Sequence, residues 1–386
     1  MIKIALFSLV LLVVLFSPGC ASRDNAPLSA IGPEASSQPA PVNSLPSRIP
    51  GPETFKPVEE DAELGDEPLD NSWEFDVPEN RGVDPEALIR YHAALDAVDI
   101  RGAVIVKDGF IIDEYYKDGY DGDTVFRMAS VTKSFSGAVV GLAIEKGYLD
   151  GVNVKLPEFF PQLNEPGQED KQEVTVEHLL THTSGIYWNE WAGGDYFRRF
   201  SSSENWVDFV LAQRMSSAPG EVFNYTTGGS HLLGAVLQEA TGMTAYEFAR
   251  EYLFDPMGMD SVAWRSDPQG ITDAGNGISM TARDAAKFGQ LYLDGGKWKD
   301  RQIISEEWVR QSVQRQAAGS PGTGEHGYSW WLRSFGGYSG YYAMGHGGQY
   351  IIVVPELNLV AVMASRVSDT YIPQRVFMEY VIPACQ

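Results

Sequence analysis

Strand patterns lie at both ends of the folded part of this chain, and helical patterns fill the middle. Apolar runs at 102–106 and 110–116 flank Lys107-Asp108-Gly109, and runs at 350–354 and 359–364 flank a second short turn at 355–358. Both patterns are typical of β-hairpins. Between about residues 130 and 308, apolar residues recur with helical spacing between Gly- and Pro-rich loops. We therefore expect an α/β (α+β) fold, in which an antiparallel sheet of about five strands from both chain ends packs against helices, with a mainly helical region between them.

Two helices can be placed beside these strands. Asp84-Pro85-Glu86 is a helix start, because Asp is a good N-cap and Pro is favoured at the first helical position. A second helix is expected over 373–381. The first should bury one face, formed by Leu88, Tyr91, Leu95 and Val98.

The charge balance limits the partners. The 386 residues include 29 basic and 52 acidic side chains, a net charge of −23, with no basic cluster that could hold a polyanion. Nucleic acid is therefore not an expected partner. Two cysteines are too few for a cysteine zinc site, and His178 and His182 have no third ligand nearby. No metal or other cofactor is expected.

The first twenty residues form a targeting signal. Lys3 precedes an apolar run over 4–16, which is too short to cross a bilayer but suits the core of a signal peptide. Gly19-Cys20 resembles the end of a bacterial lipobox, in which the cysteine is lipidated; Ser17 and Pro18 depart from that motif, so cleavage without a lipid stays open. We expect a signal peptide over 1–20 and export to the periplasmic side of a bacterial membrane. Any membrane attachment would be through a lipid on Cys20.

The composition changes twice before the folded domain. Residues 21–50 are rich in Pro and Ser, and 53–79 carry eleven acids and one Lys. Such segments bury too little apolar surface to offset the entropy of ordering them. The sequence therefore predicts a disordered linker over 21–79 and one domain over 80–386.

Ser130-Val131-Thr132-Lys133 opens a long apolar run and is the first candidate for chemistry. A serine at a helix N-terminus lies among unpaired N–H groups that can stabilise an oxyanion. Lys133 stands one helical turn later, so its amine should face the Ser130 hydroxyl and could accept the proton if burial lowers its pKa. By itself this motif is common and weak.

Two later motifs make the pattern specific. The stretch 223–229 contains Tyr225, and 344–349 reads Met-Gly-His-Gly-Gly-Gln and leads into a strand. The order of Ser-x-x-Lys, Tyr and His-Gly-Gly resembles the serine β-lactamase and penicillin-binding-protein superfamily. Within it, the likeness is to class C β-lactamases, D-alanyl-D-alanine carboxypeptidases, family VIII esterases and 6-aminohexanoate-dimer hydrolases. Segments 174–186 and 280–289 match the same group, and the resemblance covers about residues 82–386.

The resemblance implies the β-lactamase/transpeptidase-like fold and a set of catalytic roles. Ser130 would be the acylated nucleophile, with Lys133 and Tyr225 sharing the proton transfers; which of the two is the base stays open. A phenol with an ordinary pKa near 10 would need nearby positive charge to ionise. The backbone N–H groups of Ser130 and Gln349 would form the oxyanion hole.

Departures from the family pattern bear on the substrate. His346 stands where β-lactamases and carboxypeptidases carry a Lys for the substrate carboxylate, and Thr227 stands where Asn is usual. Both changes favour esters or short linear amides over β-lactams. His346 is counted with the catalytic residues, and Thr227, Gly347 and Gly348 as substrate-binding. Trp188-Asn189-Glu190 is weakly similar to the dimer-hydrolase branch.

We therefore expect an exported serine hydrolase that acts through a Ser130 acyl-enzyme on a small ester or amide. Two alternatives stay open. One is β-lactamase or D-alanyl-D-alanine carboxypeptidase activity. The other is a non-catalytic protein that binds a cell-wall ligand, against which the intact Ser130, Lys133 and Tyr225 argue.

Overall fold

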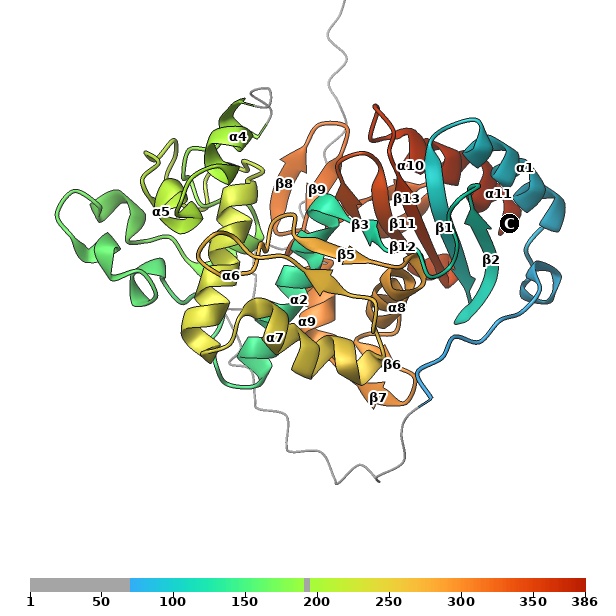
Figure 1. Ribbon diagram of the computed structural model, residues 1–386, viewed down its shortest axis with the longest axis horizontal. Helices are drawn as coiled ribbons and strands as arrows, with labels where there is room; N and C mark the ends of the chain where they lie inside the picture. The colour runs from blue at the N-terminus through green and yellow to red at the C-terminus, as the bar shows by residue number, and fades with distance from the viewer. Residues whose placement is uncertain (1–69, 191–194) are drawn as a thin grey trace, which may run out of the picture. The chain divides into compact units, whose positions relative to one another are not determined.

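The computed structural model describes residues 70–190 and 195–386 (Figure 1). The predictions for the signal peptide, for Cys20 and for most of the linker lie outside these residues. Within the described part of the chain, no helix has both the length and the apolar character needed to span a membrane.

The main sheet of the described residues has eight antiparallel strands in the order β2-β1-β13-β12-β11-β10-β9-β8. The two predicted hairpins and their union in one sheet are confirmed, whereas the predicted count of about five strands was too low, because residues 317–345 add four more. The strands are β1 (Ile100–Lys107), β2 (Phe110–Tyr116), β8 (Ala317–Ser320), β9 (Gly324–His326), β10 (Trp331–Phe335), β11 (Tyr338–Gly345), β12 (Gln349–Val354) and β13 (Leu359–Ser365).

The centre of the sheet joins the two ends of the chain. Strand β1 pairs with β13, with Val104 opposite Val362. Strands β12 and β13 are buried along their whole length. Burial on both faces explains why these strands read as continuous apolar runs rather than as alternating patterns.

Helices cover both faces of this sheet. On one face, α8 (Ala282–Leu293) packs against β1, β12 and β13; on the other lie α1 (Pro85–Asp96) and the C-terminal helices α10 (Ile372–Val376) and α11 (Ile382–Ala384) (Figure 1). Helix α1 begins as predicted, since Asp84 accepts a hydrogen bond from the backbone N–H of Glu86. The predicted C-terminal helix is confirmed as α10, a π-helical turn over Phe377–Val381, and α11.

The middle of the chain is mainly helical, as predicted, and two small sheets accompany it. The short strands are β3 (Phe126–Arg127), β4 (Ala263–Trp264) and β5 (Ile278–Met280), which form one sheet, and β6 (Lys297–Trp298) and β7 (Arg301–Gln302), which form another. The helices are α2 (Thr132–Glu145), α3 (Val176–Leu180), α4 (Asp195–Ser201), α5 (Trp206–Leu211), α6 (Thr227–Thr241), α7 (Ala245–Ala249) and α9 (Glu306–Ser312).

Residues just before position 80 also contact the domain. The Trp73 ring packs edge-on against Trp298 with centroids 5.2 Å apart, and Trp298 donates a hydrogen bond to the Asn71 side chain. Phe75 forms an isolated parallel β-bridge with Ile111 of β2. The packed domain thus begins within the last residues that the sequence assigned to the linker.

The end of β11 packs directly against the turn that carries Ser130. Gly345 has no side chain, and a Cβ there would overlap the carbonyl oxygen of Met128 and crowd Ala129. The large sheet therefore contacts the Met128–Ala129 backbone without an intervening side chain.

We predict that Gly345→Ala lowers the free energy of unfolding by about 1–3 kcal/mol, the usual cost of overpacking a core. It should also lower the rate at which a fluorophosphonate labels Ser130, because the turn must shift. Thermal unfolding and intact mass measure the two effects. The control is Gly122→Ala, where φ is not left-handed and a Cβ would meet only the guanidinium end of the flexible Arg283 side chain. Wild-type stability and labelling in Gly345→Ala would contradict this packing.

Candidate active site

Ser130 lies in a 3₁₀ turn, Ala129–Val131, between β3 and α2. Ala129 has a φ of +47°, a strained conformation for a residue with a Cβ. The Thr132 hydroxyl holds the turn: it donates to the Ala129 carbonyl at 2.5 Å and accepts from the N–H of Ile278 at 3.1 Å. Ser130 itself is partly exposed, so a substrate can reach its hydroxyl.

Lys133 reaches Ser130 from the first turn of α2. Its side chain is only 2% exposed, and its amine donates three hydrogen bonds. The acceptors are Ser130 Oγ at 3.1 Å, Thr227 Oγ1 at 3.1 Å and the Gly275 carbonyl at 2.8 Å. All three donor positions of an ammonium are therefore used, and one of them is directed at the candidate nucleophile.

Burial sets the protonation of this amine. Desolvation lowers the pKa of Lys133 to about 8, because the charged form loses its hydration. The carboxylates of Glu190 and Asp273 act in the opposite direction and favour the ammonium. The neutral amine is consequently accessible near neutral pH, as the base role requires.

Tyr225 precedes α6 and faces both residues. Lys133 Nζ lies 4.9 Å from the centre of its ring, and its phenol hydrogen-bonds with Ser130. The ring stacks on Trp331 and lies against His182, with centroids 5.6 Å and 4.5 Å apart. The structure therefore brings together Ser130, Lys133 and Tyr225, the three residues that stand in the sequence motifs.

The pKa of Tyr225 differs from the lowered value that a phenolate base would need. Burial raises the pKa of Tyr225 well above its ordinary value, and the nearby Glu190 carboxylate raises it further, although the hydrogen bond with Ser130 opposes both. A phenol in this environment stays protonated at neutral pH and is suited to donate a proton. This favours Lys133 over Tyr225 as the base.

Sequence reasoning missed the loop between β4 and β5. The Ser130 hydroxyl donates to Asn276 Oδ1 at 2.9 Å, and Gly275 supplies the carbonyl that accepts from Lys133. Asp273 holds both residues, because its Oδ1 accepts from their backbone N–H groups at 3.1 and 3.0 Å, while Arg265 pairs with its other oxygen. The sequence around 273–277 signals only a turn, and nothing in it marks a contact with Ser130.

Glu190 is another residue to which the sequence motifs assign no role. Its carboxylate accepts from the backbone N–H of Thr227 at 3.0 Å and from the Thr227 hydroxyl at 2.6 Å. The indole of Trp188 also donates to it. Gly228 makes room for this arrangement, since a Cβ there would overlap the Trp188 ring. Glu190 thus lies at the N-terminus of α6, where a negative charge is favoured.

Thr227 lies between these two groups. It is fully buried, and its hydroxyl donates to Glu190 while accepting from Lys133. The structure therefore gives this hydroxyl two protein partners, and the predicted contact with substrate stays a prediction.

The His-Gly-Gly turn joins β11 to β12 next to the Ser130 turn. His346 is exposed, and in the described part of the chain no hydrogen bond or ring contact links it to Ser130, Lys133 or Tyr225. The Gln349 side chain is buried and donates to the Ser365 carbonyl at 2.5 Å. The role of its backbone N–H in an oxyanion hole stays a prediction.

Gly347 and Gly348 have structural reasons to lack side chains. Both have left-handed φ values, +82° and +86°, and a Cβ on Gly348 would overlap the Ser365 hydroxyl. The Ser365 hydroxyl lies 2.7 and 2.5 Å from the Gly347 and Gly348 carbonyl oxygens, which share its one proton. Their predicted contacts with substrate are not needed to explain these glycines.

The two histidines that were weighed as metal ligands have other partners. His178 Nδ1 accepts from the N–H of Thr175 at 3.1 Å, and His182 Nδ1 accepts from the N–H of Thr226 at 3.3 Å. Within the described ranges, no group of three or more His, Cys, Asp or Glu side chains is placed to hold a metal ion.

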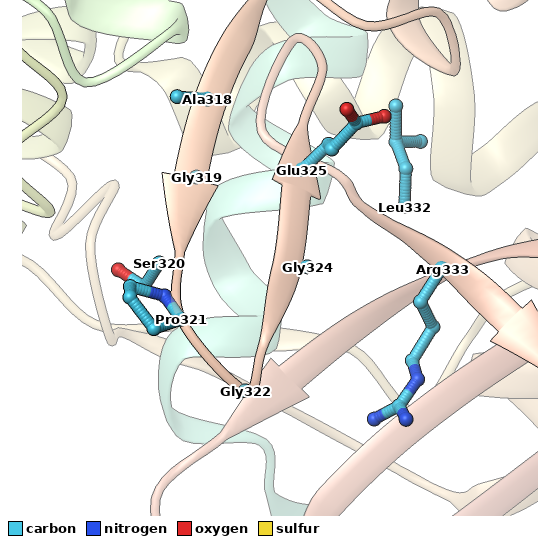
Figure 2. Close-up of a pocket in the computed structure, with 9 residues that line it drawn as sticks. All are labelled: Ala318, Gly319, Ser320, Pro321, Gly322, Gly324, Glu325, Leu332 and Arg333. Carbon is cyan, nitrogen blue, oxygen red and sulfur yellow. The ribbon is translucent and has the colours of Figure 1, made fainter. Parts of the chain in front are cut away.

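A pocket of about 620 Å³ lies over the β8–β9 hairpin, and Ser130 is not among the residues that line it (Figure 2). The charged side chains that line it are already paired: Glu325 contacts Arg315 at 3.1 Å, and Arg333 donates to Gln374 at 2.6 Å. The pocket carries no nucleophile–base pair, so the Ser130 cluster is the better candidate for the active site.

Comparison with known proteins bears on the family and the fold. The family model described as Beta-lactamase matches residues 91–371. A 6-aminohexanoate-dimer hydrolase of Paenarthrobacter ureafaciens is 26% identical over 288 residues, which cover 69% of this chain and 72% of that protein. Esterase EstB of Burkholderia gladioli is 36% identical over 151 residues, 36% of this chain and 38% of that one.

A solved structure shows the same fold. The octameric penicillin-binding protein homologue from Pyrococcus abyssi superposes with a TM-score of 0.65 at 23% identity, covering 77% of this chain and 76% of that one. The predicted fold and superfamily are therefore confirmed. The chain belongs to the beta-lactamase family and is a serine hydrolase.

Proposed function

We propose that the chain hydrolyses small esters or short linear amides through an acyl-enzyme on Ser130. The observation that carries this proposal is the buried amine of Lys133, which lies 3.1 Å from the Ser130 hydroxyl and has a pKa lowered to about 8. A serine hydroxyl is a weak nucleophile until a base removes its proton.

Acylation needs one proton to move from Ser130 to Lys133. The Ser130 oxygen then forms a bond to the substrate carbonyl carbon, and the carbonyl oxygen becomes an oxyanion. When this intermediate collapses, the bond to the leaving alcohol or amine breaks. The leaving group takes a proton either from Lys133 directly or from Tyr225, which the protonated Lys133 then reprotonates. Tyr225 is suited to this step because burial keeps it protonated.

Deacylation reverses the roles with water in place of the alcohol or amine. Water gives its proton to the base as its oxygen attacks the acyl carbon, and the Ser130 oxygen leaves with a proton returned to it. The acid product departs, and the enzyme returns to its starting protonation state without any other reactant.

Two observations support esters and short amides as the substrate class. The relatives described above include a dimer hydrolase and an esterase by name. The third motif carries the exposed His346 instead of a Lys, so a substrate carboxylate meets no permanent cation there. β-Lactams and D-alanyl-D-alanine peptides carry such a carboxylate, and uncharged esters do not.

The first twenty residues are the basis for a proposal about the cellular location of the protein. The proposal is that the chain is exported and is held on the periplasmic side of a bacterial membrane by a lipid on Cys20. The support is the apolar run over 4–16 followed by Gly19-Cys20.

The pH dependence of kcat/KM should report Lys133. The amine must be neutral to act as a base, and its pKa is lowered to about 8. We therefore expect kcat/KM for p-nitrophenyl butyrate to rise as pH increases through about 8 and to level off above it. A profile that falls over this interval would contradict the base role.

Variants of the three gathered residues should separate their roles. Ser130→Ala should abolish both turnover and fluorophosphonate labelling, whereas Lys133→Ala and Tyr225→Phe should each lower kcat by roughly 10² or more, the usual scale for positioned acid–base groups. Intact mass shows whether each variant is labelled, and circular dichroism shows whether it is folded. Labelling of another serine in Ser130→Ala would refute the assignment of the nucleophile.

Substrate preference should depend on His346. A charge-assisted contact with a carboxylate contributes about 1.5–3 kcal/mol, so wild type should hydrolyse p-nitrophenyl butyrate far better than nitrocefin. His346→Lys should raise kcat/KM for nitrocefin by roughly 10-fold and leave the ester little changed. If the kcat/KM of wild type for nitrocefin equals or exceeds its kcat/KM for p-nitrophenyl butyrate, the proposed substrate preference is wrong and the chain is a β-lactamase instead.

Membrane attachment should depend on Cys20. When the full chain is expressed in a bacterial host, wild type should partition into the detergent phase, and Cys20→Ala should release it into the periplasmic fraction. Two or more acyl chains are enough for stable binding. Soluble wild-type protein that begins after residue 21 would exclude the lipid anchor.

A further inference from the structure

Thr227 and Glu190 form a hydrogen-bonded chain that ends at the catalytic amine. The Thr227 hydroxyl donates to Glu190 Oε1 at 2.6 Å and lies 3.1 Å from Lys133 Nζ. A hydroxyl has one proton to donate, and an ionised carboxylate only accepts. Because the proton of Thr227 is committed to Glu190, its oxygen is left as an acceptor for Lys133.

The second acceptor of Lys133 is equally fixed. The Gly275 carbonyl, 2.8 Å from Nζ, has no proton to give. Gly275 packs against Thr227, since a Cβ on Gly275 would overlap the Thr227 methyl group. The two acceptors therefore belong to one packed unit and hold two N–H bonds of Lys133 in fixed directions.

This arrangement determines where the neutral amine points its lone pair. A neutral amine has two N–H bonds and one lone pair. When Lys133 loses a proton, its N–H bonds stay on Thr227 and Gly275, and the lone pair is left for the third partner, Ser130 Oγ at 3.1 Å. The Ser130 hydroxyl then turns its one proton from Asn276 Oδ1 to this lone pair. If Thr227 Oγ1 could donate instead, the lone pair could be drawn to Thr227 and away from Ser130.

We infer that Glu190 is a positioning residue that, through the Thr227 hydroxyl, fixes the direction of the Lys133 lone pair onto Ser130. This inference rests on the proposed function, because it assigns Lys133 as the base of that reaction. Glu190 is itself held in place: the Thr227 N–H donates to its Oε2 at 3.0 Å and the Trp188 indole donates to the same oxygen. Its orientation is therefore set before substrate arrives.

The charge of Glu190 provides a second, separable effect. The groups whose charge or ring faces Lys133 are Glu190 on the loop after α3, Asp273 on the β4–β5 loop, Tyr225 before α6, and the buried His182 and His326. Glu190 and Asp273 raise the pKa of Lys133, and burial holds both histidines neutral at pH 7. Removing the Glu190 charge should therefore lower the pKa of Lys133 and move its titration to lower pH.

The experiment measures how fast a fluorophosphonate labels Ser130. In this reaction the Ser130 oxygen forms a bond to phosphorus, fluoride leaves with the P–F electrons, and the Ser130 proton passes to Lys133. The rate depends on the nucleophile and its base and does not require the natural substrate. Rates are recorded from pH 6 to 10 for wild type, Glu190→Gln, Thr227→Val, Thr227→Ser and the Glu190→Gln/Thr227→Val double variant.

On the high-pH plateau, Glu190→Gln and Thr227→Val should each slow labelling by about 10-fold or more, the scale of one hydrogen bond to a charged group. The double variant should be slower than Thr227→Val alone by no more than about twofold, because Glu190 acts through the hydroxyl that is already gone. Thr227→Ser should restore most of the rate lost in Thr227→Val. The pH midpoint of labelling should move to lower pH both in Glu190→Gln and in the Glu190→Gln/Thr227→Val double variant.

A charge-matched control separates this role from a structural one. Glu204→Gln removes an exposed carboxylate outside the hydrogen-bonded chain and should change neither the plateau nor the midpoint. The inference is wrong if Glu190→Gln and Thr227→Val slow the plateau rate independently, so that their effects multiply in the double variant. It is also wrong if Glu190→Gln leaves the pH midpoint unchanged and lowers the melting temperature, because its effect on the rate is then structural.

The outcome also separates this inference from the proposed function. If wild type is labelled at Ser130 and the cycle is non-additive, but no ester or amide is turned over, the proposed substrate class fails and the positioning role stands. If wild type is not labelled at Ser130, both fail. If turnover proceeds and the cycle is additive, only the positioning role fails.

Discussion

The amine of Lys133 is the point at which the separate parts of this fold meet. Its three acceptors come from the 3₁₀ turn before α2, from the first residue of α6 and from the loop between β4 and β5. A buried amine without such partners would be costly, because burial removes its hydration. The three hydrogen bonds offset that cost and fix the mutual positions of the segments that supply them.

Other close contacts position the segments that surround the Lys133 amine. Gly345 lets the sheet contact the turn that carries Ser130, and Gly228 lets Trp188 and Glu190 approach the start of α6. Asp273 shapes the loop that presents Gly275 and Asn276. Burial lowers the pKa of Lys133 and raises that of Tyr225, so the same lack of solvent prepares the first as a base and the second as a proton donor.

Local sequence signals predicted the parts of the fold that depend on neighbouring residues. The Asp84 cap, the two hairpins and the Ser130–Lys133 spacing all depend on contacts within a few positions along the chain. Strands β8 and β9 were missed because they are short and contain glycine, with Gly319 and Gly324 in left-handed conformations. These two strands form because they pair with each other and with β10, and a local sequence pattern cannot predict such pairing.

The candidate site was predictable only as far as its motifs extend. Ser130, Lys133 and Tyr225 stand in recognisable motifs, but Asn276 and Glu190 come from loops whose sequence indicates a turn or a weak likeness and no contact. Glu190 reaches the site because α6 offers an unpaired N–H at Thr227 and because Gly228 leaves room for Trp188. Such contacts depend on where elements distant in sequence are packed.

The most direct test of this account is the titration of Lys133 itself. The full-length wild-type protein, labelled with ¹³C at the lysine ε-carbons, is titrated by NMR, and the Lys133 resonance is assigned from its loss in Lys133→Ala. The account predicts that this resonance titrates near pH 8, well below the other lysines, since burial lowers the pKa of Lys133 to about 8. A Lys133 resonance that titrates with the exposed lysines above pH 10 would show that the amine stays charged beside Ser130, and would contradict its role as the base.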